Sequence, residues 1–146
     1  MDAPRADPPE LVPLLAHLAR LSRQAAETAA EHDPAVLRPR HVIALDLLSR
    51  LGPVTQTEMA SALRLDPSNV VGLLNELERE GLLVRERDPA DRRRHIVRLS
   101  DHGAVALASS SARYQELENH VFRALTHEER WTIHDLLRRV ASTSAE

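Results

Sequence analysis

The chain has 146 residues and a formal net charge of −3 at pH 7, so it can bury the core of one domain, and any nucleic-acid site has to be a local basic patch. It has no cysteine, which excludes disulfides, thiolate metal sites and thiol redox switches, and its one Trp, one Tyr and one Phe are too few for a platform that stacks single-stranded nucleic acid. No apolar run approaches the roughly 18–20 residues that span a bilayer, and no signal peptide is recognisable, so we expect a cytoplasmic protein with no membrane partner.

Two helices are predicted in the first third of the chain. Residues 1–9 contain three prolines and are expected to form a loose arm. Leucines recur with helical spacing over residues 10–31, and Asp33-Pro34 ends this helix. A second helix over residues 38–51 stops at Gly52-Pro53 and is expected to bury five apolar side chains: Val42, Ile43, Leu45, Leu47 and Leu48.

A capping box begins the next helix. Thr55 and Glu58 have the spacing at which the hydroxyl accepts from the third helical amide and the carboxylate accepts from the N-cap amide. This helix runs to about Leu63, and we expect it to be the first helix of a helix-turn-helix. Gln56 and Thr57 lie at its N-terminus, where free backbone amides can bind a phosphate group of DNA.

The following helix carries clear signals at both ends. Asp66 is a typical N-cap residue, Pro67 occupies the first helical position, and Gly81 follows the last turn, where a left-handed cap is favoured. Between these ends, apolar residues at i, i+3, i+4 and i+7 form one stripe that is predicted to be buried: Val70, Leu73, Leu74 and Leu77.

The opposite face of this helix is small, polar and nearly free of acid, although three glutamates lie on other sides of its last two turns. Such a face can enter a major groove, and Asn69 or Asn75 would pair with base edges while Val71 touches a thymine methyl group. Gly72 would allow close backbone approach; alternatively, it only weakens an exposed helix by about 1 kcal/mol. We therefore predict DNA contacts from six residues: Pro67, Ser68, Asn69, Val71, Gly72 and Asn75.

Two short strands follow, over residues 82–85 and 96–99, and residues 82–100 hold six arginines against three acids. A basic loop at a hairpin tip suits the phosphate backbone or the minor groove, so the helix and hairpin together predict a winged helix-turn-helix. A surface hairpin with a solvated charge run is the alternative. The strand residues Arg85 and Arg98 are either phosphate contacts or solvent-facing charges. The loop residues predicted to contact DNA are Arg92, Arg93 and Arg94.

Two further helices complete the chain. A long helix begins at Ser100 and runs to about Leu125, and a second capping box, Thr126 with Glu129, opens the last helix. The first helix and these two carry apolar stripes that exceed a small winged-helix core, and such stripes usually bury against a second copy. The eight histidines lack metal-binding spacing, and no phosphate loop, nucleophile elbow or carboxylate pair is found. We therefore expect no metal, no cofactor and no enzymatic activity.

Several short motifs recur in the spacing of one protein family. They are the turn of residues 52–63, Leu77-Glu78 with the closing Gly81, the wing Asp91-Arg92-Arg93 and the exit Leu99-Ser100-Asp101-His102-Gly103. In this pattern the chain resembles the MarR family of winged-helix transcriptional regulators, with Ser100 in place of the usual threonine. Because serine keeps the hydroxyl of an N-cap, the replacement changes little.

The resemblance implies a homodimer whose terminal regions interlock and whose two recognition helices read a palindrome. It also implies that Asp91 and Arg93 hold the Asp-x-Arg positions of the wing, where the acid orients the arginine for the minor groove; Asp91 as a plain turn residue is the alternative. In this family an effector often lodges between the dimer helices and the DNA-binding part. Arg40 and His41 would line such a cleft, with Arg40 as a carboxylate partner; a helix-start arginine and a surface histidine are the alternative.

The sequence thus predicts a mainly α protein with a small β-hairpin wing, in which residues 1–146 form a single domain. Residues 37–100 are the winged helix-turn-helix, and residues 1–36 and 101–146 supply flanking dimerisation helices. The predicted function is a repressor that binds a pseudo-palindromic double-stranded DNA operator as a homodimer and is released by a small-molecule effector. The alternative is a winged-helix module whose arginine wing binds an acidic protein; it would not need an acid-free helix face.

Overall fold

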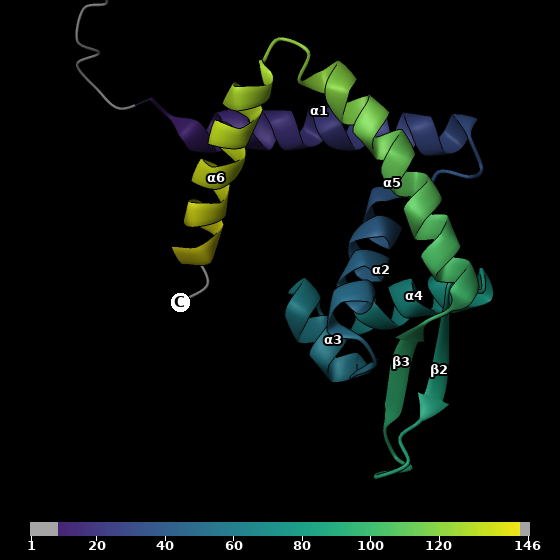
Figure 1. Ribbon diagram of the computed structural model, residues 1–146. Coiled ribbons are helices and arrows are strands. Elements are labelled where there is room, and N and C mark those ends of the chain that lie inside the picture. The colour runs from purple at the N-terminus through teal and green to yellow at the C-terminus, as the bar shows by residue number, and fades with distance from the viewer. Residues whose placement is uncertain (1–8, 144–146) are drawn as a thin grey trace, which may run out of the picture.

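The computed structural model describes residues 9–143, so the arm expected over residues 1–9 lies almost wholly outside it. The described range contains six helices and three strands (Figure 1). In chain order they are α1 (Leu11–His32), α2 (Pro39–Leu51), β1 (Val54–Thr55), α3 (Gln56–Leu63), α4 (Pro67–Arg79), β2 (Leu83–Arg87), β3 (His95–Leu99), α5 (Asp101–Val121) and α6 (His127–Thr143). The mainly helical class with a β-hairpin wing, predicted from the sequence, is confirmed.

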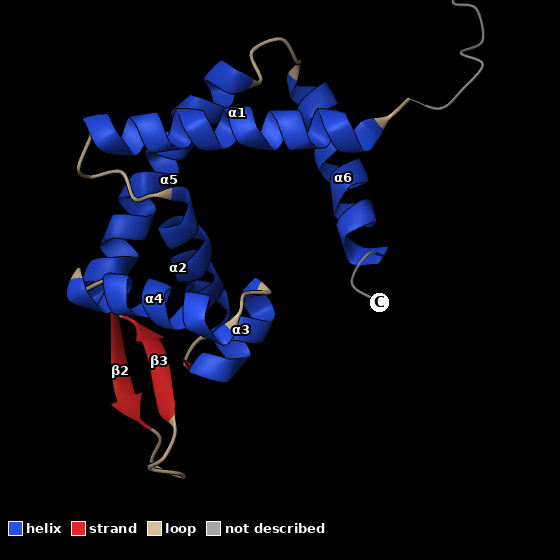
Figure 2. Ribbon diagram, turned by 180° about the vertical axis from the view of Figure 1, so that it is seen from behind, coloured by secondary structure: helices blue, strands red, loops and turns tan. Residues whose placement is uncertain are grey.

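The wing and the terminal helices lie at opposite ends of the molecule. The β2–β3 ribbon projects from one end, and α1 crosses the other end, as both views show (Figures 1 and 2). Helices α2, α3 and α4 lie between them, and α5 leads from the ribbon back to α1. Among residues 9–143, no helix combines the length and apolar character needed to cross a bilayer.

A short third strand joins the hairpin. β1 pairs with β3 in antiparallel register, Val54 opposite Val97 and Thr55 opposite Ile96, so the sheet order is β1-β3-β2. The sequence did not predict this strand, because two residues cannot show an alternating pattern. Thr55 has two roles, as the last strand residue and as the N-cap of α3. The strand therefore ties the start of the helix-turn-helix to the wing.

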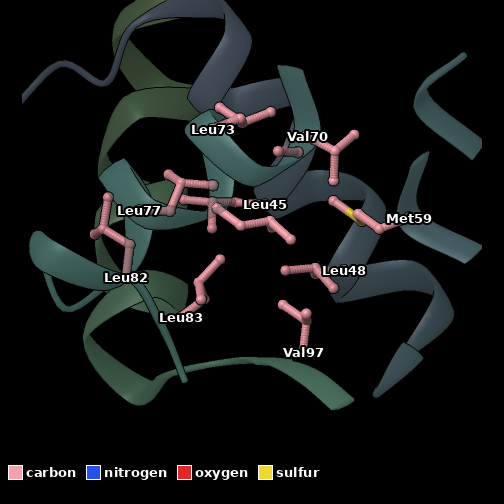
Figure 3. Close-up of a cluster of buried hydrophobic side chains, with 11 residues drawn as sticks. Leu45, Leu48, Met59, Val70, Leu73, Leu77, Leu82, Leu83 and Val97 are labelled. Carbon is pink, nitrogen blue, oxygen red and sulfur yellow. The ribbon is translucent and has the colours of Figure 1, made fainter. Parts of the chain in front are cut away.

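The core lies where α2, α3 and α4 meet the sheet. The stripe predicted on α4 is buried, which confirms the 3.6-residue pattern of that helix. Figure 3 shows these side chains directed toward residues from the other elements. The fully buried partners of the stripe are Leu45, Leu48, Met59, Leu83 and Val97.

The inner face of α2 differs from the prediction. Ile43 was expected to be buried, but its exposed fraction is 60%. The buried residues of α2 are His41, Ala44, Leu45 and Leu48. They share one helical face, which turns Ile43 outward, and the small Ala44 was overlooked because its apolar signal is weak. A histidine, which the sequence alone did not place in the core, therefore occupies the first buried position of α2.

The predicted helix ends are mostly confirmed. Gly81 has φ +72°, and the N–H groups of Gly81 and Leu82 donate to the carbonyls of Glu78 and Leu77, which is a Schellman cap. The Thr126 and Glu129 capping box closes with distances of 2.7 and 3.2 Å. The α5 helix ends at Val121, a turn before the predicted end at Leu125.

Asp66 stands at the N-cap position of α4, but its side chain does not cap the helix. Its carboxylate instead accepts from the amide Nδ2 of Asn69 at 3.3 Å. The prediction was right about where α4 begins and wrong about the hydrogen bond that begins it. Pro67 at the first helical position, with its fixed φ, is sufficient to start the helix.

α5 holds the connection between α1 and α2. The N–H of Leu37 donates to Ser110 Oγ at 2.9 Å, and that hydroxyl donates to the carbonyl of Ala35 at 3.3 Å. One turn later, the Tyr114 hydroxyl donates to the carbonyl of Leu37 at 3.0 Å. The buried Ser110 thus satisfies backbone groups that would otherwise lack partners.

Candidate nucleic-acid interface

The outer face of α4 is free of packing contacts. Ser68, Asn69, Gly72 and Asn75 are exposed, and Val71 is 38% exposed. A methyl group added at Gly72 would meet no atom within 4 Å, so the backbone is bare at the middle of the helix. The face opposite the buried stripe is therefore as small as the sequence predicted, and another molecule can approach it closely.

The two glutamates within α4, Glu76 and Glu78, form ion pairs with neighbouring elements. Glu76 Oε2 lies 2.6 Å from Arg40 Nη2 and 3.1 Å from His41 Nε2. Glu78 Oε2 lies 3.4 Å from Arg85 Nη1. These pairs reduce the repulsion that the glutamates would exert on a nearby phosphate backbone.

Arg85 joins the wing to the recognition helix. Its side chain is 19% exposed, and Nη1 donates to the amide oxygen of Asn75 at 2.7 Å. The structure therefore places Arg85 against α4. The sequence analysis considered a phosphate contact and a solvent-facing charge for this residue, but not a contact with α4. Arg98, in contrast, is half-exposed and pairs with Glu86 on the other strand at 2.7 Å, an interaction that raises the pKa of its guanidinium.

Two aspartates shape the wing loop through its backbone. Asp88 accepts from the N–H of Ala90 at 2.9 Å, and Asp91 accepts from the N–H of Arg93 at 3.0 Å. The Arg94 N–H also donates to the carbonyl of Asp91 at 2.9 Å. Asp91 acts here as a turn residue, so any orienting effect on Arg93 passes through the backbone rather than through its guanidinium.

The three wing arginines are available to a ligand. The guanidinium groups of Arg92, Arg93 and Arg94 are exposed and form no hydrogen bond or ion pair with any part of the chain between residues 9 and 143. Placing three like charges in one short loop is unfavourable unless an anion offsets them. The three arginines lie in the loop between β2 and β3, at the tip of the projecting ribbon (Figure 2).

A polar hollow lies between the wing and the start of α3. Its volume is about 230 Å³, and it is lined by Thr55, Gln56, Thr57, Arg93, Arg94 and His95. The capping box beside it is complete, because Glu58 accepts from the Thr55 N–H at 2.7 Å and donates its own N–H to Thr55 Oγ1 at 3.2 Å. Hydrogen bonds from the Thr55 amide and hydroxyl lower the pKa of Glu58, and Arg94 adds to this effect. As residues of the first helical turn, Gln56 and Thr57 have backbone N–H groups without partners inside the helix.

The proposed effector residues divide between the surface and the core. Arg40 is 54% exposed and lines a cavity of about 490 Å³ together with Arg23 and Arg38. His41, the next residue, is buried. Its Nδ1 atom lies 3.8 Å from Glu80 Oε2, and its Nε2 atom is hydrogen-bonded to Glu76 Oε2. A second, mainly apolar cavity of about 340 Å³ is lined by Ala26, Tyr114, Leu117 and their neighbours on α1 and α5. His41 lines neither cavity.

The sequence did not reveal two links to the recognition helix. One joins Arg40 and His41 of α2 to Glu76, and the hydrogen bond from His41, followed by the charge of Arg40, lowers the pKa of Glu76. The other is the bond from Arg85 to Asn75. The sequence contains Glu76, and it contains Arg85 ten residues after Asn75, but the contact of each residue with its partner depends on the fold. Among residues 9–143, no cluster of three or more His, Asp or Glu could hold a metal ion.

The comparisons with known proteins agree with this geometry. Residues 37–94 match the model of the MarR family. The HTH-type transcriptional regulator YwhA of Bacillus subtilis is 32% identical over 108 residues, which cover 70% of this chain and 78% of YwhA. A transcriptional regulatory protein assigned to the hcr operon of Thauera aromatica is 30% identical over 102 residues, 70% of this chain. The match spans 61% of that relative's length, and 58% of the B. subtilis regulator YdgJ.

Solved structures show the same fold over nearly the whole chain. A crystal structure of MarR has a TM-score of 0.82 at 26% identity, and the match covers 99% of this chain and 96% of MarR. A MarR-family regulator from Rhodococcus sp. RHA1 has a TM-score of 0.77 at 29% identity, covering 88% and 89% of the two chains. Sequence and fold together show that the chain belongs to the MarR family of transcriptional regulators.

Proposed function

We propose that the protein is a repressor that binds a pseudo-palindromic DNA duplex as a homodimer. The observation that carries this proposal is a small, exposed polar face on α4, with open space at Gly72, together with three unpaired guanidinium groups on the wing. Helix α4 would enter the major groove, and the wing would reach the adjacent minor groove, where arginine is favoured. The residues of the interface are those predicted from the sequence, except that Arg85 supports α4 instead of reaching a phosphate.

The alternative, a module whose wing binds an acidic protein, accounts for less of the structure. It explains the arginines but requires neither the bare backbone at Gly72 nor the exposed amides of Asn69 and Asn75. DNA binding accounts for all three features.

The homodimer is supported by apolar side chains at the end opposite the wing. On α1 and α6, eleven large apolar residues are exposed within the single chain. This is far more apolar surface than two helices of a soluble monomer usually expose. Members of the MarR family bind DNA as dimers. The exposed residues are Leu11, Val12, Leu14, Leu15, Leu18 and Leu21 on α1, and Trp131, Ile133, Leu136, Leu137 and Val140 on α6.

Repression and its release are supported by relatives. NicR of Pseudomonas putida, 30% identical over 89 residues, is named a transcriptional repressor. PcaV of Streptomyces coelicolor, 27% identical, has been solved in complex with its natural ligand. In this chain, Arg23, Arg38 and Arg40 line a cavity that is also lined by Glu27 and Glu31. The three guanidinium groups suit a small carboxylate, so we place the effector beside the arginines. A ligand on Arg40 would compete with Glu76 and thereby act on the recognition helix.

The test is selection of duplex DNA from a random pool, followed by fluorescence-anisotropy binding at two salt concentrations. We expect a palindromic site that binds far more tightly than scrambled duplex and weakens steeply with salt. If no sequence is enriched and binding stays weak for every duplex, the DNA function is wrong and the acidic-partner alternative takes its place.

The wing contribution is tested with Arg93→Ala. Loss of this arginine is expected to weaken operator binding and to reduce the salt slope by about one for each wing in the complex. The matched control is Arg113→Ala, which removes the same charge from α5, where Arg113 pairs with Asp33 and Glu116. An unchanged affinity and slope for Arg93→Ala would remove the wing from the mechanism.

A further inference from the structure

We propose that Arg85 is a positioning residue that fixes the amide of Asn75, so that α4 reads a hydrogen-bond acceptor on one base edge. This inference rests on the proposed DNA-binding function and specifies what one side chain of the interface recognises. Three observations carry it: the bond between the two residues, the low exposed fraction of the Arg85 side chain (19%), and the exposure of Asn75 on the outer face of α4.

The bond determines which end of the amide faces outward. An asparagine side chain has an acceptor oxygen and a donor nitrogen, and by itself it can present either one. A guanidinium group has only donors, so the end of Asn75 that faces Arg85 has to be the oxygen. The 2.7 Å contact from Arg85 Nη1 to Asn75 Oδ1 has this arrangement. The Nδ2 group, with its two N–H donors, is left on the exposed face.

Arg85 is held firmly enough to impose this orientation. It lies in β2 directly opposite Val97, a fully buried residue of β3. Its charge is balanced by Glu78 at 3.4 Å, on the same helix as Asn75. Its Nε and Nη2 atoms are buried and have no hydrogen-bond partner in the described part of the chain. Two buried donor atoms without partners lower the stability of the fold. We therefore expect the contact made by Nη1 to have a function that offsets this loss.

The orientation restricts which bases Asn75 can read. Asparagine normally recognises adenine by accepting from N6 with its oxygen and donating to N7 with its nitrogen. The oxygen of Asn75 is already engaged by a cation, which disfavours that bidentate pairing. The free Nδ2 donors instead suit an edge rich in acceptors, and guanine presents two acceptors, N7 and O6, in the major groove. The expected base at this position is guanine.

The experiment uses the full-length protein and DNA selected from a random pool. Comparison of the wild type with Asn75→Ala identifies the base pair whose preference depends on Asn75. At that pair we expect the wild type to favour guanine over adenine by at least about tenfold, the discrimination of a good base contact. In Arg85→Met the preference should fall to about twofold or less, while Arg85→Lys, which again offers only donors, should restore most of it.

Arg98→Met is the matched control. Arg98 lies opposite Val84 on the neighbouring strand and carries the same charge, but its partner is Glu86 and it does not touch α4. This variant should lose general affinity without changing the base preference at the Asn75 pair. A change of base identity in Arg85→Met alone separates positioning from loss of charge and from loss of stability.

Asn75→Asp gives an independent test that changes only an exposed group. A carboxylate can still accept from Arg85 but has no donor, so the preference should move from guanine to cytosine, whose amino group is a donor. If Arg85→Met does not fold, Asn75→Asp still tests which end of the Asn75 amide contacts the base. The inference is overturned if the wild type favours adenine at this pair, if no pair depends on Asn75, or if Arg85→Met keeps the guanine preference. If the wild type enriches no site, the proposed function is overturned, and this inference with it.

Discussion

Two helical glycines have opposite roles in this protein. A Cβ atom built at Gly103, in the first turn of α5, would lie 1.9 Å from the carbonyl oxygen of Leu82. The obstacle is backbone, which cannot rotate away, so this glycine lets α5 start directly against the segment between α4 and β2. At Gly72 on α4, the same atom would meet open space. The first glycine serves folding, and the second leaves a surface bare.

Gly103→Ala is therefore expected to destabilise the fold by about 1–3 kcal/mol, the usual effect of overpacking, even though alanine favours a helix. Chemical denaturation monitored by circular dichroism measures this change. A variant as stable as the wild type would show that α5 can shift without loss, and that the close contact with Leu82 is not required.

Gly72→Ala is expected to have the opposite effect on stability. Alanine at an exposed helical position should raise the free energy of unfolding by about 0.5–1 kcal/mol. The added methyl group would, however, occupy the face that approaches the major groove, so affinity for the selected operator should fall. Parallel denaturation and anisotropy measurements check both signs. If affinity is unchanged, Gly72 is only a weak helix residue and has no part in recognition.

At the scale of elements, the link between α2 and α4 makes the recognition helix sensitive to acid. The hydrogen bond from His41 and the charge of Arg40 lower the pKa of Glu76 in the folded protein. Because the pKa of Glu76 is lower in the folded protein than in the unfolded chain, its ionised form stabilises the fold. This stabilisation is complete above the ordinary glutamate pKa of about 4.3 and is lost as the pH falls through the lowered pKa. Protonation of Glu76 in the folded protein, and with it the weakening of the link, therefore requires a pH below the ordinary glutamate pKa.

Glu76→Gln is expected to lower the melting temperature at pH 7 and to reduce the further loss between pH 7 and pH 4. Thermal unfolding at the two pH values measures both effects. Glu58 and Glu129, whose pKa values are also lowered by their capping hydrogen bonds, contribute equally to both proteins and cancel in the comparison. Glu78→Gln is the control on the same helix. An identical pH dependence in Glu76→Gln and the wild type would contradict the proposed link.

The elements were predictable from the sequence where local signals agree. Caps at Thr55, Ser100 and Thr126 and the Schellman glycine at residue 81 fix helix ends through neighbours in the chain, and the structure contains all four. The leucine stripe of α4 was readable because four large residues repeat with one period. The elements and contacts that were missed depend on distant partners. The β1 strand exists only because β3 lies beside it, and His41 is buried only because Glu76 and Glu80 come within reach.

The candidate site follows the same division. Exposure of the α4 face could be predicted, because it is the complement of the buried stripe. The roles of Asn75 and Arg85 could not be separated, because their contact joins a helix to a strand ten residues away. Asp91 was left with two possible roles by its spacing, and the structure places its carboxylate on the backbone of the wing turn.

At the scale of the whole molecule, the described chain separates the proposed DNA-binding surface from an apolar end. The wing and α4 lie at one end, and the exposed leucines of α1 lie at the other (Figure 1). α5 connects the two ends, and through Ser110 and Tyr114 it also holds the α1–α2 connection. If the apolar end is the dimer interface, the spacing of the two recognition helices depends on the orientation of α5, because α5 connects that interface to the winged helix-turn-helix.

The double variant Leu14→Glu, Leu136→Glu tests this arrangement. Both leucines are half-exposed in the single chain, at 53% and 50%, so their replacement should leave the protomer folded while opposing burial against a second copy. Mass measurement at micromolar concentration should give a dimer for the wild type and a monomer for the variant. Val105→Glu, a change at an apolar residue of α5 that is 66% exposed, is the control and should remain dimeric.

The monomer should also bind DNA differently. With one recognition helix and one wing per molecule, it is expected to bind a half-site and the full palindrome with similar affinity per site, and its salt slope should be about half that of the wild type. The wild type should prefer the full palindrome strongly. A monomeric variant that keeps this preference would show that two protomers assemble on DNA through other surfaces. A variant that remains a dimer would show instead that the apolar end of α1 and α6 is not the interface.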